Sequence, residues 1–228
     1  DRSPSRGLGD VYKRQALARI QPSFKIPQET MDINARGTSL LCEFARKNNA
    51  KLVYAGSSSY YGGVYLNPYS FAKWQGEETC KMYSKIYGVS TSIARFFNVY
   101  GERHLKTGPY ATVVGIFELQ KSNNQVLTIT GTGEQRRDFT HVSDIVSGLI
   151  SMSEEKWLGE IFNLGTGKNY SINELAAMFK AETTYIPSRP GEAWITLADI
   201  QKSIDNIDYC PEVELEDYVS SWLSEQDD

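Results

Sequence analysis

Residues 51–97 read KLVYAGSSSYYGGVYLNPYSFAKWQGEETCKMYSKIYGVSTSIARFF, and this stretch decides the fold class. It begins with a short β-prone run that ends at Gly56 and is followed by a loop of serine, tyrosine and glycine. A segment of helical length then lies between Pro68 and Gly88, which are residue types typical of the first position and the end of a helix. A second β-prone run occupies residues 89–97. Strand, loop, helix and strand in this order predict a βαβ unit in a parallel sheet.

The alternation of helix and strand extends on both sides of this unit. Helix-spaced apolar residues predict a helix over 28–48. Beyond residue 101 the expected elements are helices over 111–121, 198–206 and 215–224, a helix that begins at Ser143 or Asp144, and strands over 126–130, 138–141, 160–164 and 183–187. Ser171 and Glu174 have the spacing of a capping box, so another helix is expected to begin there.

The first fifteen residues, DRSPSRGLGDVYKRQ, do not continue this pattern. They have no apolar periodicity and no signal-type hydrophobic segment, and they look like translated adapter sequence. We therefore interpret residues 1–15 as a non-native leader that lies outside the fold. The native protein is then expected to extend upstream of residue 16.

The composition excludes several classes of function. The 228 residues carry a net charge of −4, so there is no bulk positive field to hold nucleic acid or an anionic membrane. Three cysteines at wide spacing and two histidines indicate neither a disulfide framework nor a metal site. We expect a cytoplasmic protein that binds a small molecule, with no nucleic-acid, membrane or metal partner.

The residues with the clearest chemical potential are Tyr69 and Lys73, which lie four apart on one face of the predicted helix. The serine loop Ser57-Ser58-Ser59 precedes them by one short connection, at the carboxyl edge of the sheet where open α/β folds place their sites. A tyrosine that is ionised near neutral pH needs its pKa lowered by about three units, or about 4 kcal/mol of preferential anion stabilisation. A neighbouring ammonium and a helix N-terminus favour that ionised form. A surface tyrosine that stacks on its lysine is the alternative.

Five motifs occur in an order and spacing that resemble a known family. They are YAGSSSYYG at 54–62, PYSFAK at 68–73, RFFNVYG at 95–101, GTGEQRRDF at 131–139 and RPGE at 189–192. The chain from residue 16 to 226 is similar to the extended short-chain dehydrogenase/reductases, and most similar to NAD-dependent nucleotide-sugar epimerases and dehydratases of the UDP-glucose 4-epimerase type. The resemblance implies a Rossmann-type parallel sheet, with its first strands missing here, over residues 16–100. It also implies a smaller C-terminal α/β substrate domain over residues 101–228, interleaved with the first.

The resemblance also assigns roles to individual residues. Tyr69 matches the catalytic tyrosine, and Lys73 matches the lysine that lowers its pKa and holds the nicotinamide ribose of NAD. Ser57 matches the catalytic serine or threonine, and Phe96 falls beside the nicotinamide. Three further residues match the groups that hold the sugar-nucleotide diphosphate: Asn98, Arg137 and Arg189. Guanidinium groups suit diphosphate oxygens and act locally in an acidic protein, although each arginine taken alone is more typical of a surface ion pair.

The two residues after Ser57 separate the reactions within this family. Members that eliminate water carry an acidic residue at one or both positions, where this chain has Ser58 and Ser59. A hydroxyl does not replace a carboxylate in general acid–base work. We therefore expect an isomerase that epimerises a nucleotide sugar of the UDP-hexose type through a keto intermediate. A dehydratase, a keto-sugar reductase and a non-catalytic nucleotide sensor remain as alternatives.

The chain departs from the family pattern in two places. No G-x-G-x-x-G fingerprint for a dinucleotide pyrophosphate occurs anywhere in the sequence. The resemblance therefore predicts an N-terminally truncated, inactive fragment of a protein that is a homodimer at full length. Only seven residues separate Tyr61 from Tyr69, a shorter connection than is usual for these epimerases. Because this loop helps to shape the sugar pocket, the sugar and the nucleotide base stay open.

Overall fold

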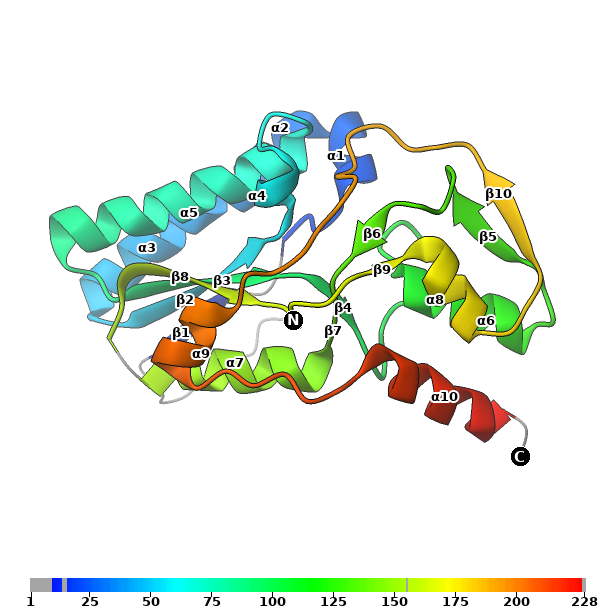
Figure 1. Ribbon diagram of the computed structural model, residues 1–228. Helices are drawn as coiled ribbons and strands as arrows, with labels where there is room; N and C mark the ends of the chain where they lie inside the picture. The colour runs from blue at the N-terminus through cyan, green and yellow to red at the C-terminus, as the bar shows by residue number, and fades with distance from the viewer. Residues whose placement is uncertain (1–9, 14–15, 155, 227–228) are drawn as a thin grey trace.

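The computed structural model describes residues 10–13, 16–154 and 156–226. Within them a parallel sheet of four strands has the order β1-β2-β3-β8. The strands are β1 (Asp10–Lys13), β2 (Lys51–Ser57), β3 (Thr91–Phe96) and β8 (Leu158–Leu164). Helices cover both faces of this sheet (Figure 1). The predicted α/β class with a parallel sheet is confirmed.

Strand β1 differs from our expectation that residues 1–15 lie outside the fold. Its four residues pair in parallel with β2, from Asp10 opposite Lys51 to Lys13 opposite Tyr54. The interpretation rested on the lack of apolar periodicity, and a four-residue strand is too short to show one. The rest of that segment, 1–9 and 14–15, lies outside the described residues.

Two helical layers enclose the sheet (Figure 1). Helices α3 (Gly37–Asn48) and α5 (Pro68–Tyr87) pack on one face, and α7 (Val142–Glu154) and α9 (Gln201–Ile207) on the other. The first face buries Cys42, Ala45, Ala50, Leu52, Tyr54, Cys80, Val89 and Ile93. The second buries Val53, Ala94, Ile145, Leu149, Met152, Phe162, Leu164, Ile207 and Tyr209. Because both faces are covered, β2 and β3 are buried along most of their length.

The helix predicted over 28–48 is interrupted by one turn of wider π-helix. It consists of α2 (Pro27–Met31), the π segment Asp32–Arg36 and α3. The wider turn buries the side chain of Asn34, whose amide accepts the Leu17 N–H at 3.0 Å and donates to the Leu17 carbonyl at 3.1 Å. The inserted residue therefore ties the helix to the segment before α1 (Ile20–Lys25).

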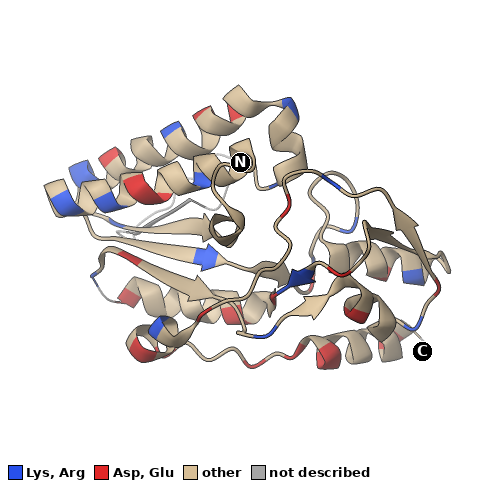
Figure 2. Cartoon of the chain, turned by 45° about the horizontal axis from the view of Figure 1, so that its top comes forward, with Lys and Arg blue, Asp and Glu red and all other residues tan. Residues whose placement is uncertain are grey.

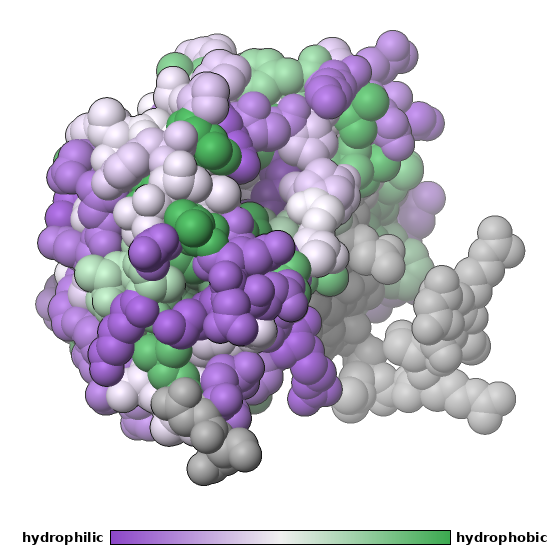
Figure 3. Space-filling model, turned by 90° about the vertical axis from the view of Figure 1, so that its right-hand side faces the viewer, coloured by the Kyte–Doolittle hydropathy of each residue, from purple (hydrophilic) through white to green (hydrophobic). Residues whose placement is uncertain are grey.

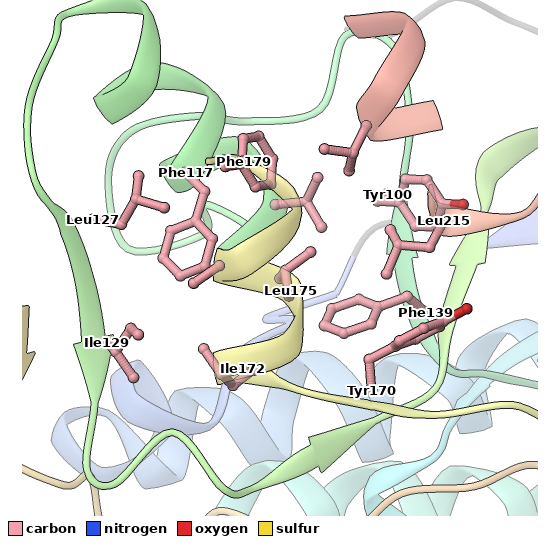
Figure 4. Close-up of a cluster of buried hydrophobic side chains, with 13 residues drawn as sticks. Tyr100, Phe117, Leu127, Ile129, Phe139, Tyr170, Ile172, Leu175, Phe179 and Leu215 are labelled. Atoms are coloured by element: carbon pink, nitrogen blue, oxygen red, sulfur yellow. The ribbon is translucent and has the colours of Figure 1, made fainter. Parts of the chain in front are cut away.

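A smaller lobe has its own core. The parallel pair β5 (Leu127–Thr130) and β10 (Thr183–Ile186) packs with α6 (Val113–Ser122), α8 (Ile172–Met178) and α10 (Leu215–Gln226). Figure 4 shows aromatic and aliphatic side chains of β5, α6, α8 and α10 meeting Tyr100, Phe139 and Tyr170 in one cluster. The predicted capping box is present, because Ser171 and Glu174 exchange their side-chain and backbone hydrogen bonds at the start of α8.

Short strands connect the two lobes. They are β4 (Asn98–Tyr100) with β7 (Phe139–His141), and β6 (Arg136–Arg137) with β9 (Tyr170–Ser171). The chain then returns to the large lobe in α7, β8 and α9, so residues 101–228 contribute to both lobes. The end of the molecule in Figure 3 is mostly hydrophilic, with separate apolar patches. No helix in the described part of the chain is long and apolar enough to cross a bilayer.

Candidate active site

A cavity of about 1260 Å³ opens between the two lobes, at the carboxyl ends of β2 and β3. Its walls come from α1, the start of α5, the ends of both strands, and the facing side of the small lobe. The charged residues that line it are Arg19, Lys25, Lys73, Arg137, Arg189 and Glu192. Figure 2 shows β6, with its two arginines, as a blue strand between the lobes. Five cations and one anion favour an anionic ligand in an otherwise acidic protein.

Helix α5 brings the predicted catalytic residues together. The Tyr69 hydroxyl donates to Oγ of Ser57 at 3.3 Å, and Nζ of Lys73 donates to the carbonyl of Ala55 at 2.9 Å. Asn67 caps the helix by accepting the Ser70 N–H at 2.8 Å, and Pro68 occupies the first position. The end of β2 and the first turns of α5 therefore meet at one point of the cavity, as the sequence predicts.

One glycine allows this close approach of α5 to β2. A Cβ at Gly76 would lie 2.2 Å from the hydroxyl oxygen of Tyr54 and 2.6 Å from its ring carbon. That hydroxyl donates to the Lys73 carbonyl at 3.3 Å, and the Lys73 ammonium lies 5.2 Å from the centre of the Tyr54 ring. Tyr54 is thus a spacer that sets the distance between helix and strand.

The serine loop is fixed from below by a buried ion pair. Ser57 lies opposite Phe96 in the sheet. Beneath the loop, Arg95 and Glu77 are bonded at 2.6 Å with side chains only 6% and 1% exposed. A Cβ at Gly56 would lie 2.8 Å from a Glu77 carboxylate oxygen, so the strand end rests directly on this pair. The position of Ser57 therefore depends on two residues that lie outside the cavity lining.

The environment of Tyr69 raises its pKa above the ordinary value, and burial is the main cause. The hydrogen bond to Ser57 and the positive charge of Arg19 act in the opposite direction, and the charge of Glu77 raises the pKa further. The resemblance implies that Lys73 lowers the pKa of Tyr69, and that role stays a prediction. In this environment the phenol keeps its proton at neutral pH, and any added positive charge favours its release.

Phe96 and Asn98 occupy the floor of the cavity between the lobes. Phe96 ends β3, where its ring also packs against the core under the sheet. Asn98 begins β4, and its backbone N–H donates to the carbonyl of Asp138 at 2.9 Å. The structure therefore places both residues on the same cavity as Tyr69, and their predicted contacts with cofactor and diphosphate remain predictions.

The two predicted diphosphate arginines differ in their surroundings. Arg137 is half-buried, donates to the carbonyls of Arg136 and Trp194 at 2.9 and 3.3 Å, and lies 3.6 Å from the Glu192 carboxylate. Burial lowers its pKa, and the charge of Glu192 opposes that effect. Arg189 lines the cavity and is exposed, with no hydrogen bond or ion pair to any described residue. Arg137 is therefore held by partners within the protein, whereas Arg189 has none among the described residues.

Several residues that line the cavity were not predicted from the sequence. Arg19 precedes α1 and donates from Nε and Nη2 to the carbonyl of Tyr110 at 3.3 and 2.7 Å. Thr128, Thr130 and Gln135 line the wall formed by the small lobe. A lone arginine in the otherwise apolar run 16–20 is the one signal that would have marked Arg19.

The cavity lining fits one end of a nicotinamide dinucleotide. Hydroxyls at Ser57 and Tyr69, the ammonium of Lys73 and the ring of Phe96 are the donors and the apolar face that a ribose and a nicotinamide ring need. These groups suit an organic cofactor. No group of three or more histidine, cysteine or acidic side chains is placed to hold a metal ion in the part of the chain that the structure describes.

Comparison with known proteins agrees with this geometry. A profile of the NAD dependent epimerase/dehydratase family matches residues 7–165. The UDP-glucuronate 4-epimerase of Thermodesulfobacterium geofontis is 32% identical over 232 residues, covering 92% of this chain and 70% of that protein.

Solved structures show the same fold. The UDP-glucose 4-epimerase of Thermotoga maritima, solved with UDP-glucose, superimposes with a TM-score of 0.88 at 26% identity, over 96% of this chain and 78% of its own. The UDP-glucuronic acid 4-epimerase of Bacillus cereus, solved with UDP-glucuronic acid and NAD, gives a TM-score of 0.82 at 28% identity, over 93% and 73%. The chain belongs to the NAD-dependent epimerase/dehydratase family of nucleotide-sugar enzymes.

Proposed function

We propose that this chain carries the catalytic residues of an NAD-dependent epimerase that inverts one carbon of a UDP-hexose through a keto intermediate. The observation that carries the proposal is the lack of a second acid or base beside the serine loop. Among the described residues that line the cavity, Glu192 is the one carboxylate, and it lies 3.6 Å from Arg137. Elimination of water needs a proton donor and a base at the sugar, and Ser58 and Ser59 supply neither.

Each residue then has a defined task. Tyr69 removes the proton from a sugar hydroxyl and later returns it, with Ser57 as the hydrogen-bond partner of its oxygen. Lys73, Ser57, Tyr69 and Phe96 hold the nicotinamide half of NAD, which supplies reversible hydride transfer when it is bound. The sugar turns over between the two hydride transfers, so the cavity must hold the diphosphate while it leaves the sugar free.

The diphosphate is assigned to Arg137, Arg189 and Asn98. A guanidinium binds phosphate oxygens through paired hydrogen bonds. Arg137 is held by Glu192 and by backbone carbonyls, and Arg189 belongs to an exposed segment. Binding at the diphosphate keeps the nucleotide fixed at a distance from Tyr69.

The test is the substitution Tyr69→Phe. The sequence has no glycine-rich pyrophosphate turn, so Tyr69 and Lys73 hold only half of the dinucleotide and we expect the chain alone to be inactive. Turnover of UDP-glucose to UDP-galactose is therefore assayed with the chain fused behind a strand–turn–helix segment that carries a glycine-rich pyrophosphate-binding turn.

Tyr69→Phe is expected to abolish turnover in the fused protein. In the unfused chain it is expected to leave UDP-galactose affinity unchanged within a few fold, because the hydroxyl does chemistry and the arginines do the binding. Turnover near the unsubstituted level in the Tyr69→Phe protein would refute the assignment. A stable keto product that absorbs in alkali would favour the dehydratase alternative instead.

A further inference from the structure

We propose that Arg19 is a positioning residue for the reaction: its guanidinium, fixed at the cavity wall, stabilises Tyr69 once the phenol has lost its proton. The inference rests on the proposed function of Tyr69 as the group that moves the sugar proton. It adds a cation from outside the tyrosine–lysine pair, on a segment that carries none of the recognised motifs.

Arg19 is fixed relative to Tyr69 by the packing of α1 against α5. Arg19 is the residue directly before α1, and Ser23 lies inside that helix. The Oγ of Ser23 accepts the backbone N–H of Tyr69 at 3.2 Å, and Ser23 is itself buried. A hydrogen bond therefore joins α1 to the first turn of α5, at Tyr69 itself.

The guanidinium itself is held by the other lobe. Its Nε and Nη2 both donate to the carbonyl of Tyr110, at 3.3 and 2.7 Å, in the loop that precedes α6. Two bonds to one acceptor fix the plane of the group, while Nη1 has no hydrogen-bond partner among the described residues. Burial of this group makes its charge act more strongly than a solvated charge would.

The charges around Tyr69 give Arg19 its effect. The charged and titratable groups close to the phenol or to its neighbours are Lys73 and Glu77 on α5, Tyr54 on β2, Arg95 on β3, Arg19 directly before α1, and Glu192 in the loop after β10. Lys25, at the far end of α1, lines the same cavity but is not among the groups that shift the pKa of Tyr69. The charge of Arg19 lowers the pKa of Tyr69, whereas Glu77 and burial raise it. Glu77 is already bonded to Arg95, so Arg19 offsets the burial of the phenol from the cavity side.

A purely structural role for Arg19 is the competing explanation, since its bonds to Tyr110 also join the two lobes. The substitution Arg19→Gln separates the two roles, because glutamine keeps an amide N–H donor for the Tyr110 carbonyl and loses the charge. Arg19→Lys keeps the charge and loses the fork of donors. Lys25→Gln is the matched control, because it removes one cation from the same cavity, at the opposite end of α1 from Arg19.

The experiment measures the ionisation of Tyr69 directly in the 228-residue chain. Difluorotyrosine is inserted at position 69 by codon suppression, so that its lowered phenol pKa brings the titration into the range where the protein is folded. Fluorine NMR then follows a single resonance against pH. Arg19→Gln is expected to move the midpoint to higher pH by about 1 unit, the low end of the effect of a nearby opposite charge. Arg19→Lys and Lys25→Gln are expected to leave it close to the unsubstituted chain.

Two results would overturn the proposal. The first is an unchanged midpoint in Arg19→Gln. The second is an equal upward displacement in Arg19→Gln and Arg19→Lys, which would assign the effect to the paired hydrogen bonds with Tyr110, lost in both variants, and not to the charge. Neither result depends on turnover, so the titration fails or succeeds independently of the Tyr69→Phe assay. A midpoint that moves as predicted while Tyr69→Phe stays active would refute the proposed function and leave the electrostatic coupling intact.

Discussion

Replacing Glu77 by alanine is expected to destabilise the protein strongly, because it leaves a buried guanidinium without its counter-charge. The Glu77 carboxylate accepts three contacts from Arg95, at 2.6, 3.1 and 3.2 Å. Both side chains are almost completely buried. Arg95 has no other acidic partner among the described residues, although its guanidinium lies 3.6 Å from the centre of the Tyr60 ring.

The size of the effect follows from burial. Removing one partner of a buried ion pair costs about 3–5 kcal/mol, whereas an exposed pair contributes about 0–1 kcal/mol. The chain offers a matched exposed pair in Glu43 and Arg46, which are 2.8 Å apart with side chains 33% and 40% exposed. We therefore expect Glu77→Ala to cost about 3–5 kcal/mol and Glu43→Ala to cost much less.

Urea unfolding followed by circular dichroism measures both free energies in the 228-residue chain. The double substitution Glu77→Leu with Arg95→Met removes both charges, so it is expected to be less destabilising than Glu77→Ala alone. Equal costs for Glu77→Ala and Glu43→Ala would refute the reasoning. A double variant less stable than Glu77→Ala would show instead that the packing of Arg95 under Tyr60 dominates.

Three further predictions concern other parts of the molecule. Arg189→Ala is expected to weaken UDP-galactose binding by about 1.5–3 kcal/mol in calorimetry, while Arg136→Ala, outside the cavity, leaves it unchanged. Asp138→Asn is expected to cost about 1.5–3 kcal/mol or more in urea unfolding, because the two oxygens of the buried carboxylate together accept three backbone N–H bonds of 2.9–3.1 Å, and the amide nitrogen that replaces one oxygen cannot accept its share. Burial raises the pKa of Glu118, but hydrogen bonds from His104, Lys106 and Tyr218 bring it below its ordinary value. Its contribution is therefore present above the unfolded pKa of about 4.3 and lost at lower pH, so the stability advantage over Glu118→Gln should shrink as pH falls below that value.

The βαβ unit and the proximity of its proposed catalytic residues were predictable because their signals are local. Residues 51–97 contain both strands, the helix and the loop, and helical geometry alone places Tyr69 and Lys73 on one face. The strand end places Ser57 at the same edge of the sheet. The structure joins Tyr69 and Ser57 at 3.3 Å, so short-range periodicity was sufficient for this part of the site.

Arg19 and the π segment were not predictable, because their roles depend on distant parts of the chain. Arg19 reaches Tyr110, which lies 91 positions away, and it sits next to the segment that we set aside as a leader. Within the helix predicted over 28–48, the π segment places the side chain of Asn34 where it bonds the backbone of residue 17. Neither contact produces a periodic pattern in the neighbouring sequence, so neither could be predicted from it.

The short connection between Tyr61 and Tyr69 shows where a family pattern stops determining a pocket. Tyr65, at the tip of this loop, is 81% exposed, so its ring does not fill the cavity. The segment after β10 makes the wall instead: Asn67 donates to the Gly191 carbonyl at 2.9 Å, and a Cβ at Gly62 would lie 2.6 Å from that of Ala193. The segment that forms this wall lies about 120 residues further along the chain. The shape of the sugar pocket therefore depends on tertiary packing that the sequence of the loop does not determine.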